Sequence, residues 1–183
     1  FRRLFGEGSF NAAFIPSYSK ELVKGKRKSE NFANNIFNLL SIFLLALVFL
    51  VELFMPLFVS LIAPGFKSDP EKFELATQLT KITFPFIMFV SLASFFSAIL
   101  NSHNRFAAAS AAPIILNIVM IGILVFGKFL GEKLVIFLSY GVSIAGLIQA
   151  IFLIIFVKKF FKPKLKFNFT ISKEVKLFFK KLV

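Results

Sequence analysis

Arg3, Glu7 and Asn11 recur at every fourth position near the start of the chain, which places them on one face of a helix. Arg2 lies about 100° around that helix from Arg3, at the edge of the same face. A guanidinium stays charged and binds a phosphate through two hydrogen bonds. Because charge inside a bilayer usually faces a cavity, this face predicts a site that receives or gates an anionic substrate. The alternative is a set of headgroup anchors at a helix end.

Pro16, Pro85 and Pro113 lie inside apolar segments and predict bends, because proline disrupts the backbone hydrogen bond to the fourth residue before it. Pro85 follows Lys81 by four residues, so a kink is expected beside a charge, as in the broken helices of transporters. Lys81 is equally consistent with snorkelling to the headgroups. Pro16 and Pro113 also predict bends. Such a bend could allow the helix to move during transport, or it could be a fixed kink. Asn117, one turn after Pro113, can bond a neighbouring helix.

The elements that carry these residues are apolar enough to cross a membrane. Hydrophobic residues make up 57% of the chain, 29 of its 183 residues are Phe, and the mean hydropathy is +0.83. A soluble domain of this size has too little interior for so much apolar surface. The pattern therefore predicts an all-α polytopic transmembrane bundle. We expect five membrane helices, at about residues 1–22, 32–63, 70–100, 107–129 and 134–157, and then a basic segment, 161–183, that leads to a further helix.

The charge is unevenly spread, with 22 basic and 9 acidic residues and a net charge of +13. The basic residues gather after the first, third and fifth apolar segments, at residues 20–28, 105 and 158–166. By the positive-inside rule these boundaries are cytoplasmic, and the turns after the second and fourth segments face outward. A nucleic-acid binder would carry its basic stripe on a soluble fold. The expected partners are therefore anionic membrane lipids and not nucleic acid.

The sequence holds no pattern typical of an enzyme. It has one His and no Cys, no Ser or Cys nucleophile motif, no phosphate loop and no metal-ligand spacing. We therefore expect neither catalysis nor a bound metal or cofactor. A rival interpretation, an intramembrane enzyme acting on polyprenyl phosphates, would need clustered carboxylates at the membrane boundary. Another rival, a channel or structural subunit, would not need charge facing a closed cavity.

Short motifs in order along the chain resemble the MurJ/MviN family, the bacterial lipid II flippases. The first and most specific is RRLFGEGSF at 2–10 with AFIP at 13–16, which matches the family signature RR-F-EG-F---F-P. The others are APGF at 63–66, KITFP at 81–85, SLAS at 91–94, ILN at 99–101, NRF at 104–106, AP at 112–113 and LNI at 116–118. The motifs are spread in order across about two-thirds of the chain, and together they make the resemblance specific.

The resemblance implies a fourteen-helix transporter of the multidrug/oligosaccharidyl-lipid/polysaccharide exporter superfamily, with two lobes around a cationic cavity. The chain, which starts at Phe1 with residues typical of a helix interior, would then be a fragment. Its residues 1–160 would be roughly the second to sixth helices of the N-terminal lobe. The family's roles carry over to Arg2, Arg3 and Glu7 as cavity or gate residues. The implied substrate is lipid II or a similar polyprenyl-pyrophosphate-linked glycan, moved by alternating access across the bacterial inner membrane. An exporter of another amphipathic molecule is the alternative.

Overall fold

The computed structural model describes residues 9–127, 131–164 and 175, and this part of the chain contains helices and no strands. The all-α fold predicted from the sequence is confirmed. The α-helices are α1 (Ser9–Val23), α2 (Lys26–Leu53), α3 (Met55–Ile62), α4 (Pro70–Thr83), α5 (Phe86–Ser102), α6 (Phe106–Phe126) and α7 (Leu134–Val157). Short 3₁₀ turns at Pro64–Ser68 and Gly131–Lys133 precede α4 and α7.

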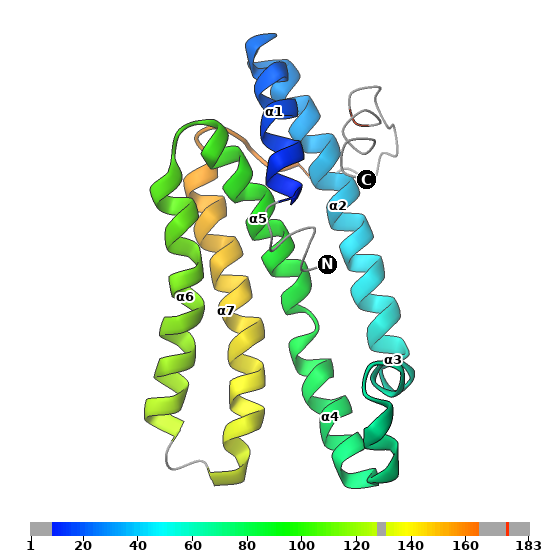
Figure 1. Cartoon of the computed structure of the whole chain (residues 1–183). Coiled ribbons are helices and arrows are strands. Elements are labelled where there is room, and N and C mark those ends of the chain that lie inside the picture. The colour runs from blue at the N-terminus through cyan, green and yellow to red at the C-terminus, as the bar shows by residue number, and fades with distance from the viewer. Residues whose placement is uncertain (1–8, 128–130, 165–174, 176–183) are drawn as a thin grey trace.

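The helices run back and forth between two ends of an elongated bundle (Figure 1). The α1–α2 turn, the α5–α6 turn and the end of α7 gather at one end, while α3, the start of α4 and the start of α7 lie at the other. Gly25 makes the α1–α2 turn with a φ of 122°, a conformation that favours glycine. Because the three predicted basic boundaries meet at one end, the bundle has a basic end, which we define as these two turns and residues 158–164.

Four helical segments are long and apolar enough to cross a membrane: Lys26–Leu53, Pro70–Ser102 taken as one, Phe106–Phe126 and Leu134–Val157. Large apolar side chains are exposed along them, among them Phe49 at 72% and Phe126 at 80%. Water would not tolerate so much exposed apolar surface, whereas lipid does. The protein is therefore a multi-pass membrane protein. The fifth expected membrane helix, 1–22, is represented by the 15 residues of α1, and residues 1–8 lie outside the described part.

Two of the expected membrane helices are each divided near a proline, and the bend expected at Pro85 is one of these divisions. The segment 32–63 is α2, which begins earlier than expected at Lys26, followed after Phe54 by α3, with Pro56 in its first turn. The segment 70–100 is α4 and α5, separated by Phe84 and Pro85. At that break the Ser143 hydroxyl of α7 donates a hydrogen bond to the carbonyl of Ile82 at 2.6 Å. A side chain of α7 therefore satisfies a backbone group beside the break.

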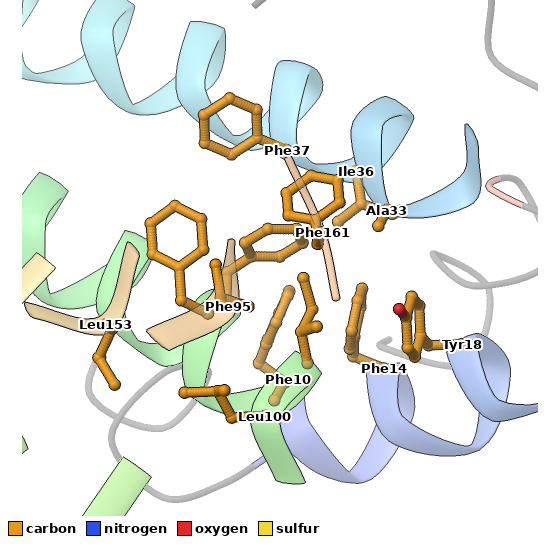
Figure 2. Close-up of a cluster of buried hydrophobic side chains, with 14 of the residues drawn as sticks. Phe10, Phe14, Tyr18, Ala33, Ile36, Phe37, Phe95, Leu100, Leu153 and Phe161 are labelled. Atoms are coloured by element: carbon orange, nitrogen blue, oxygen red, sulfur yellow. The ribbon is translucent and has the colours of Figure 1, made fainter. Parts of the chain in front are cut away.

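Packing within the bundle rests on small residues of α7 and on an aromatic cluster at the basic end. A Cβ on Gly146 would lie 2.6 Å from Phe86 Cδ2 of α5, and one on Gly141 would overlap Ile123 of α6. The aromatic cluster joins α1, α2, α5 and the residues after α7 (Figure 2). Its buried rings include Phe10, Phe14, Tyr18, Phe37, Phe95 and Phe161. This cluster fixes α1 against its neighbours and so sets the orientation of the remaining residues of α1.

Candidate functional site

A polar cavity of about 270 Å³ lies among α1, α5, α6 and α7. Its lining residues are Asn11, Val90, Ala93, Ser94, Ser97, Asn101, Ala109, Ser110, Ala112, Pro113, Gln149 and Leu153. Six of these carry amide or hydroxyl groups, which is unusual at the depth of membrane helices. Polar groups there usually line a substrate or water path or join helices by hydrogen bonds.

Asn11 reaches this cavity because the aromatic cluster holds α1. Phe10 and Phe14, on either side of Asn11 in sequence, are 3% and 0% exposed. The two rings stack on each other with centroids 5.5 Å apart, and each also contacts Phe95 of α5. Asn11 Oδ1 is buried and accepts no hydrogen bond from the part of the chain that the structure describes. An unsatisfied buried amide oxygen is costly, so Asn11 Oδ1 is set up to accept from water or from a bound polar group.

The other walls come from α5, α6 and α7. Ser94, Ser97 and Asn101 follow one another at spacings of three and four residues along one face of α5. Gln149 is 4% exposed and lies on one buried face of α7 with Gly141 and Ala145, at spacings of four residues. These three polar residues of α5 were not predicted as site residues from the sequence. Their helical spacing inside an apolar segment could have indicated them.

The predicted site residues are only partly brought together here. Asn11 and Pro113 line the cavity. Asn117 is exposed on α6, one turn beyond Pro113, and Pro16 is exposed on α1. Arg2, Arg3 and Glu7 lie outside the described residues, so their place relative to the cavity stays a prediction.

Lys81 and Pro85 lie away from the cavity, at the junction of α4 and α5. Lys81 is exposed in the last turn of α4, and its charge acts on Glu52 of α2. Glu52 Oε1 is buried without a hydrogen-bond partner among the described residues. Since a lone carboxylate is poorly accommodated in a membrane bundle, the neighbouring lysine partly offsets its charge.

The chemistry available in the cavity is neutral hydrogen bonding. Amides and hydroxyls can bind water, hydroxyl groups or amide groups. The residues that line the cavity carry no charge that could neutralise a phosphate. Within residues 9–127, 131–164 and 175, no three His, Asp or Glu side chains gather as metal ligands. The cavity therefore fits a polar surface along a transport path and does not resemble a catalytic centre.

The comparisons with known proteins agree on one family. A family model described as lipid II flippase MurJ matches residues 1–183. A "Probable lipid II flippase MurJ" of Rickettsia prowazekii (strain Madrid E) is 42% identical over 160 residues, which cover 87% of this chain and 31% of that protein. One from Rhizobium tropici is 43% identical over 154 residues, covering 81% and 29%. One from Aquifex aeolicus (strain VF5) is 35% identical over 187 residues, covering 100% and 36%. The chain spans about a third of the length of the curated relatives it matches.

Proposed function

The chain belongs to the MurJ family of lipid II flippases, and from this membership we propose that the protein carrying it moves lipid II across the bacterial cytoplasmic membrane. The match of the family model to all of residues 1–183 is the observation that carries the proposal. The resemblance read from the signature at residues 2–16 is confirmed. The transporter works by alternating access, in which the two lobes expose one cavity to each side in turn.

The residues of the signature have separate roles in this proposal. Arg2 and Arg3 bind the pyrophosphate of the substrate, because guanidinium groups hold phosphate oxygens bidentately. Glu7 pairs with an arginine or closes a gate when no substrate is present. Asn11 lies one turn beyond Glu7 on the same helical face and lines the polar cavity among α1, α5, α6 and α7. Its unsatisfied amide oxygen supports a path in which uncharged polar groups of the substrate, or water, follow the charged head.

The test replaces the charged residues in the full-length protein and measures lipid II on each leaflet of the membrane. Arg3→Ala and Glu7→Ala should each abolish flipping while the protein still inserts and accumulates. Arg3→Lys should rescue flipping only in part, because an ammonium keeps the charge but loses the bidentate geometry. Arg27→Ala, which removes an exposed arginine of the α1–α2 turn region, is the matched control and should flip normally.

Three results would count against the proposal. Normal lipid II translocation in both alanine variants would make Arg3 and Glu7 headgroup anchors. Lipid II distributed normally in cells depleted of the protein, with a different polyprenyl-linked glycan accumulating on the inner leaflet, would assign another substrate to the same transporter. Loss of the alanine variants from the membrane would give Arg3 and Glu7 a packing role.

A further inference from the structure

A second and larger hollow, about 610 Å³ in volume, lies at the basic end between the start of α2 and the residues after α7. Five lysines line it: Lys26, Lys158, Lys159, Lys162 and Lys164. Four asparagines of α2 line it as well: Asn31, Asn34, Asn35 and Asn38. We call this hollow the lysine–asparagine basin. It shares no lining residue with the polar cavity described above.

The basin is held in shape by the fold. The backbone N–H of Lys164 donates to Asn34 Oδ1 at 2.9 Å, and Asn34 Nδ2 donates to the carbonyl of Glu30 at 3.0 Å. Phe161 is 1% exposed and lies against Phe37 of α2 and Phe95 of α5 (Figure 2). The four basin lysines at 158–164 are therefore fixed beside α2, because both a backbone hydrogen bond and a buried ring anchor the segment that carries them.

The charge of the basin suits an anion. Glu30 is the one carboxylate among its lining residues, and it lies 4.0 Å from Lys26 as an exposed pair. Four lysines after α7 then face the same hollow with no acidic residue among the other lining residues. Asparagine amides add neutral donors and acceptors, which bind hydroxyl and ester oxygens. Lysines with neighbouring amides form a site for a phosphate that carries hydroxyl groups.

One face of α2 runs from the basin into the apolar part of the bundle. Asn31, Asn35 and Asn38 share this face with Ile42, Leu45 and Phe49, since their spacing follows the helical repeat. Leu45 is 47% exposed and Phe49 is 72% exposed. The face is thus polar beside the lysines and apolar and exposed beyond them. A membrane lipid has the same order of headgroup and acyl chain.

We propose that the lysine–asparagine basin binds the phosphate headgroup of an anionic phospholipid, whose acyl chain lies along Leu45 and Phe49 of α2. This goes beyond lipid II transport and beyond diffuse attraction of a basic tail to the membrane, because it assigns one saturable site to named residues. The bound lipid would hold the segment after α7 against α2.

The experiment measures lipid binding to the full-length protein in dodecyl maltoside by native mass spectrometry. Palmitoyl-oleoyl phosphatidylglycerol should bind at one saturable site, and the phosphatidylcholine with the same chains should not. Lys158→Gln/Lys162→Gln should weaken that binding about tenfold. Lys20→Gln/Lys28→Gln removes the same charge from exposed residues at the same end that do not line the basin, and should change it less than about twofold.

An uncharged variant separates the basin from surface charge. Asn31→Leu/Asn35→Leu leaves the net charge unchanged and should still weaken phosphatidylglycerol binding several-fold. If a double variant does not accumulate, Asn31→Leu alone at its exposed position serves instead. Equal weakening in both lysine pairs, or no effect of the asparagine changes, would overturn the proposal in favour of diffuse attraction.

Two competitors identify the ligand. Glycerol 3-phosphate that competes as well as the lipid would overturn the acyl-chain part and leave a site for free phosphate. Undecaprenyl diphosphate that displaces phosphatidylglycerol at lower concentration would overturn the phospholipid assignment and make the basin a site for polyprenyl diphosphates. Because these measurements read binding and not flipping, the proposed transport activity can fail without affecting them.

Discussion

At the scale of single residues, some polar side chains of the bundle stabilise the fold by hydrogen bonds, and others have no hydrogen-bond partner among the described residues. The amide of Asn34 both donates and accepts, and joins α2 to the segment after α7. Asn11 Oδ1 is buried but accepts no hydrogen bond within the described chain. Folding alone gives no reason to bury an unsatisfied amide oxygen, since an apolar residue of that size would be better. This supports the proposal that Asn11 Oδ1 accepts from water or from a bound polar group in the polar cavity.

The stability of the protein should depend on pH through His103. Its Nε2 lies 3.2 Å from the Tyr18 hydroxyl, and its ring stacks on Phe160 with centroids 4.3 Å apart. Burial lowers the pKa of His103 below its usual value of 6.5, so the folded protein favours the neutral ring. The stabilisation that depends on this group should be complete above about pH 6.5 and lost as the pH falls through the lower folded pKa.

The check compares the melting temperature of the wild type with that of His103→Gln between about pH 8 and about pH 5. The wild type should lose more stability on acidification than the variant, which keeps a polar side chain but does not titrate. Parallel losses would show that other groups set the pH dependence.

At the scale of elements, breaks near prolines divide two membrane segments into pairs of helices. The α4–α5 break depends on Pro85, and the Ser143 hydroxyl of α7 donates to the Ile82 carbonyl beside it. If Pro85→Ala restores a continuous helix, the Ile82 carbonyl gains a backbone partner in Phe86. The hydroxyl of Ser143 is then no longer needed there.

A double-mutant cycle tests this coupling. Ser143→Ala alone should cost about 1 kcal/mol of stability, because it leaves a backbone carbonyl without its side-chain donor. In the Pro85→Ala background the same change should cost clearly less. Equal costs in the two backgrounds would mean that the hydrogen bond and the break are independent.

The contact of α7 with α5 depends on the absence of a side chain at Gly146. A Cβ there would lie 2.6 Å from Phe86 Cδ2 and 3.2 Å from Phe89 Cβ, which cannot move without the backbone. Gly146→Ala should destabilise the protein by about 1–3 kcal/mol through overpacking. Gly122→Ala on α6 is the matched control, because nothing lies within 4 Å of its Cβ position, and it should be neutral or slightly stabilising. Equal melting temperatures for the two variants would contradict the packing described.

At the scale of the whole molecule, the sequence predicted the membrane helices well because hydropathy and length decide them. The breaks at Phe54 and Pro85 were harder to place, since a proline in a membrane helix can bend it or end it, and neighbours such as Ser143 decide which. The helical spacing of Ser94, Ser97 and Asn101 could have shown from the sequence that they share one face of α5. That this face lies beside Gln149 could not be predicted, because it depends on how α5 and α7 pack.

The arrangement of the basic residues leads to the last prediction, which concerns the orientation of the bundle. The α1–α2 turn, the α5–α6 turn and the end of α7 lie together at the basic end (Figure 1). The positive-inside rule predicts that this end is cytoplasmic and that the Pro64–Ser68 turn and Lys133 face outward. In full-length protein without other cysteines, single cysteines at Lys28 and Arg105 should react with an impermeant maleimide only after the inner membrane is opened. Cysteines at Ser68 and Lys133 should react in cells whose inner membrane is intact. All four positions are exposed, so burial would not explain a failure to label. Labelling of Lys28 and Ser68 from the same side would contradict the crossing of the membrane by α2 and α3, and with it the positions of the turns that follow.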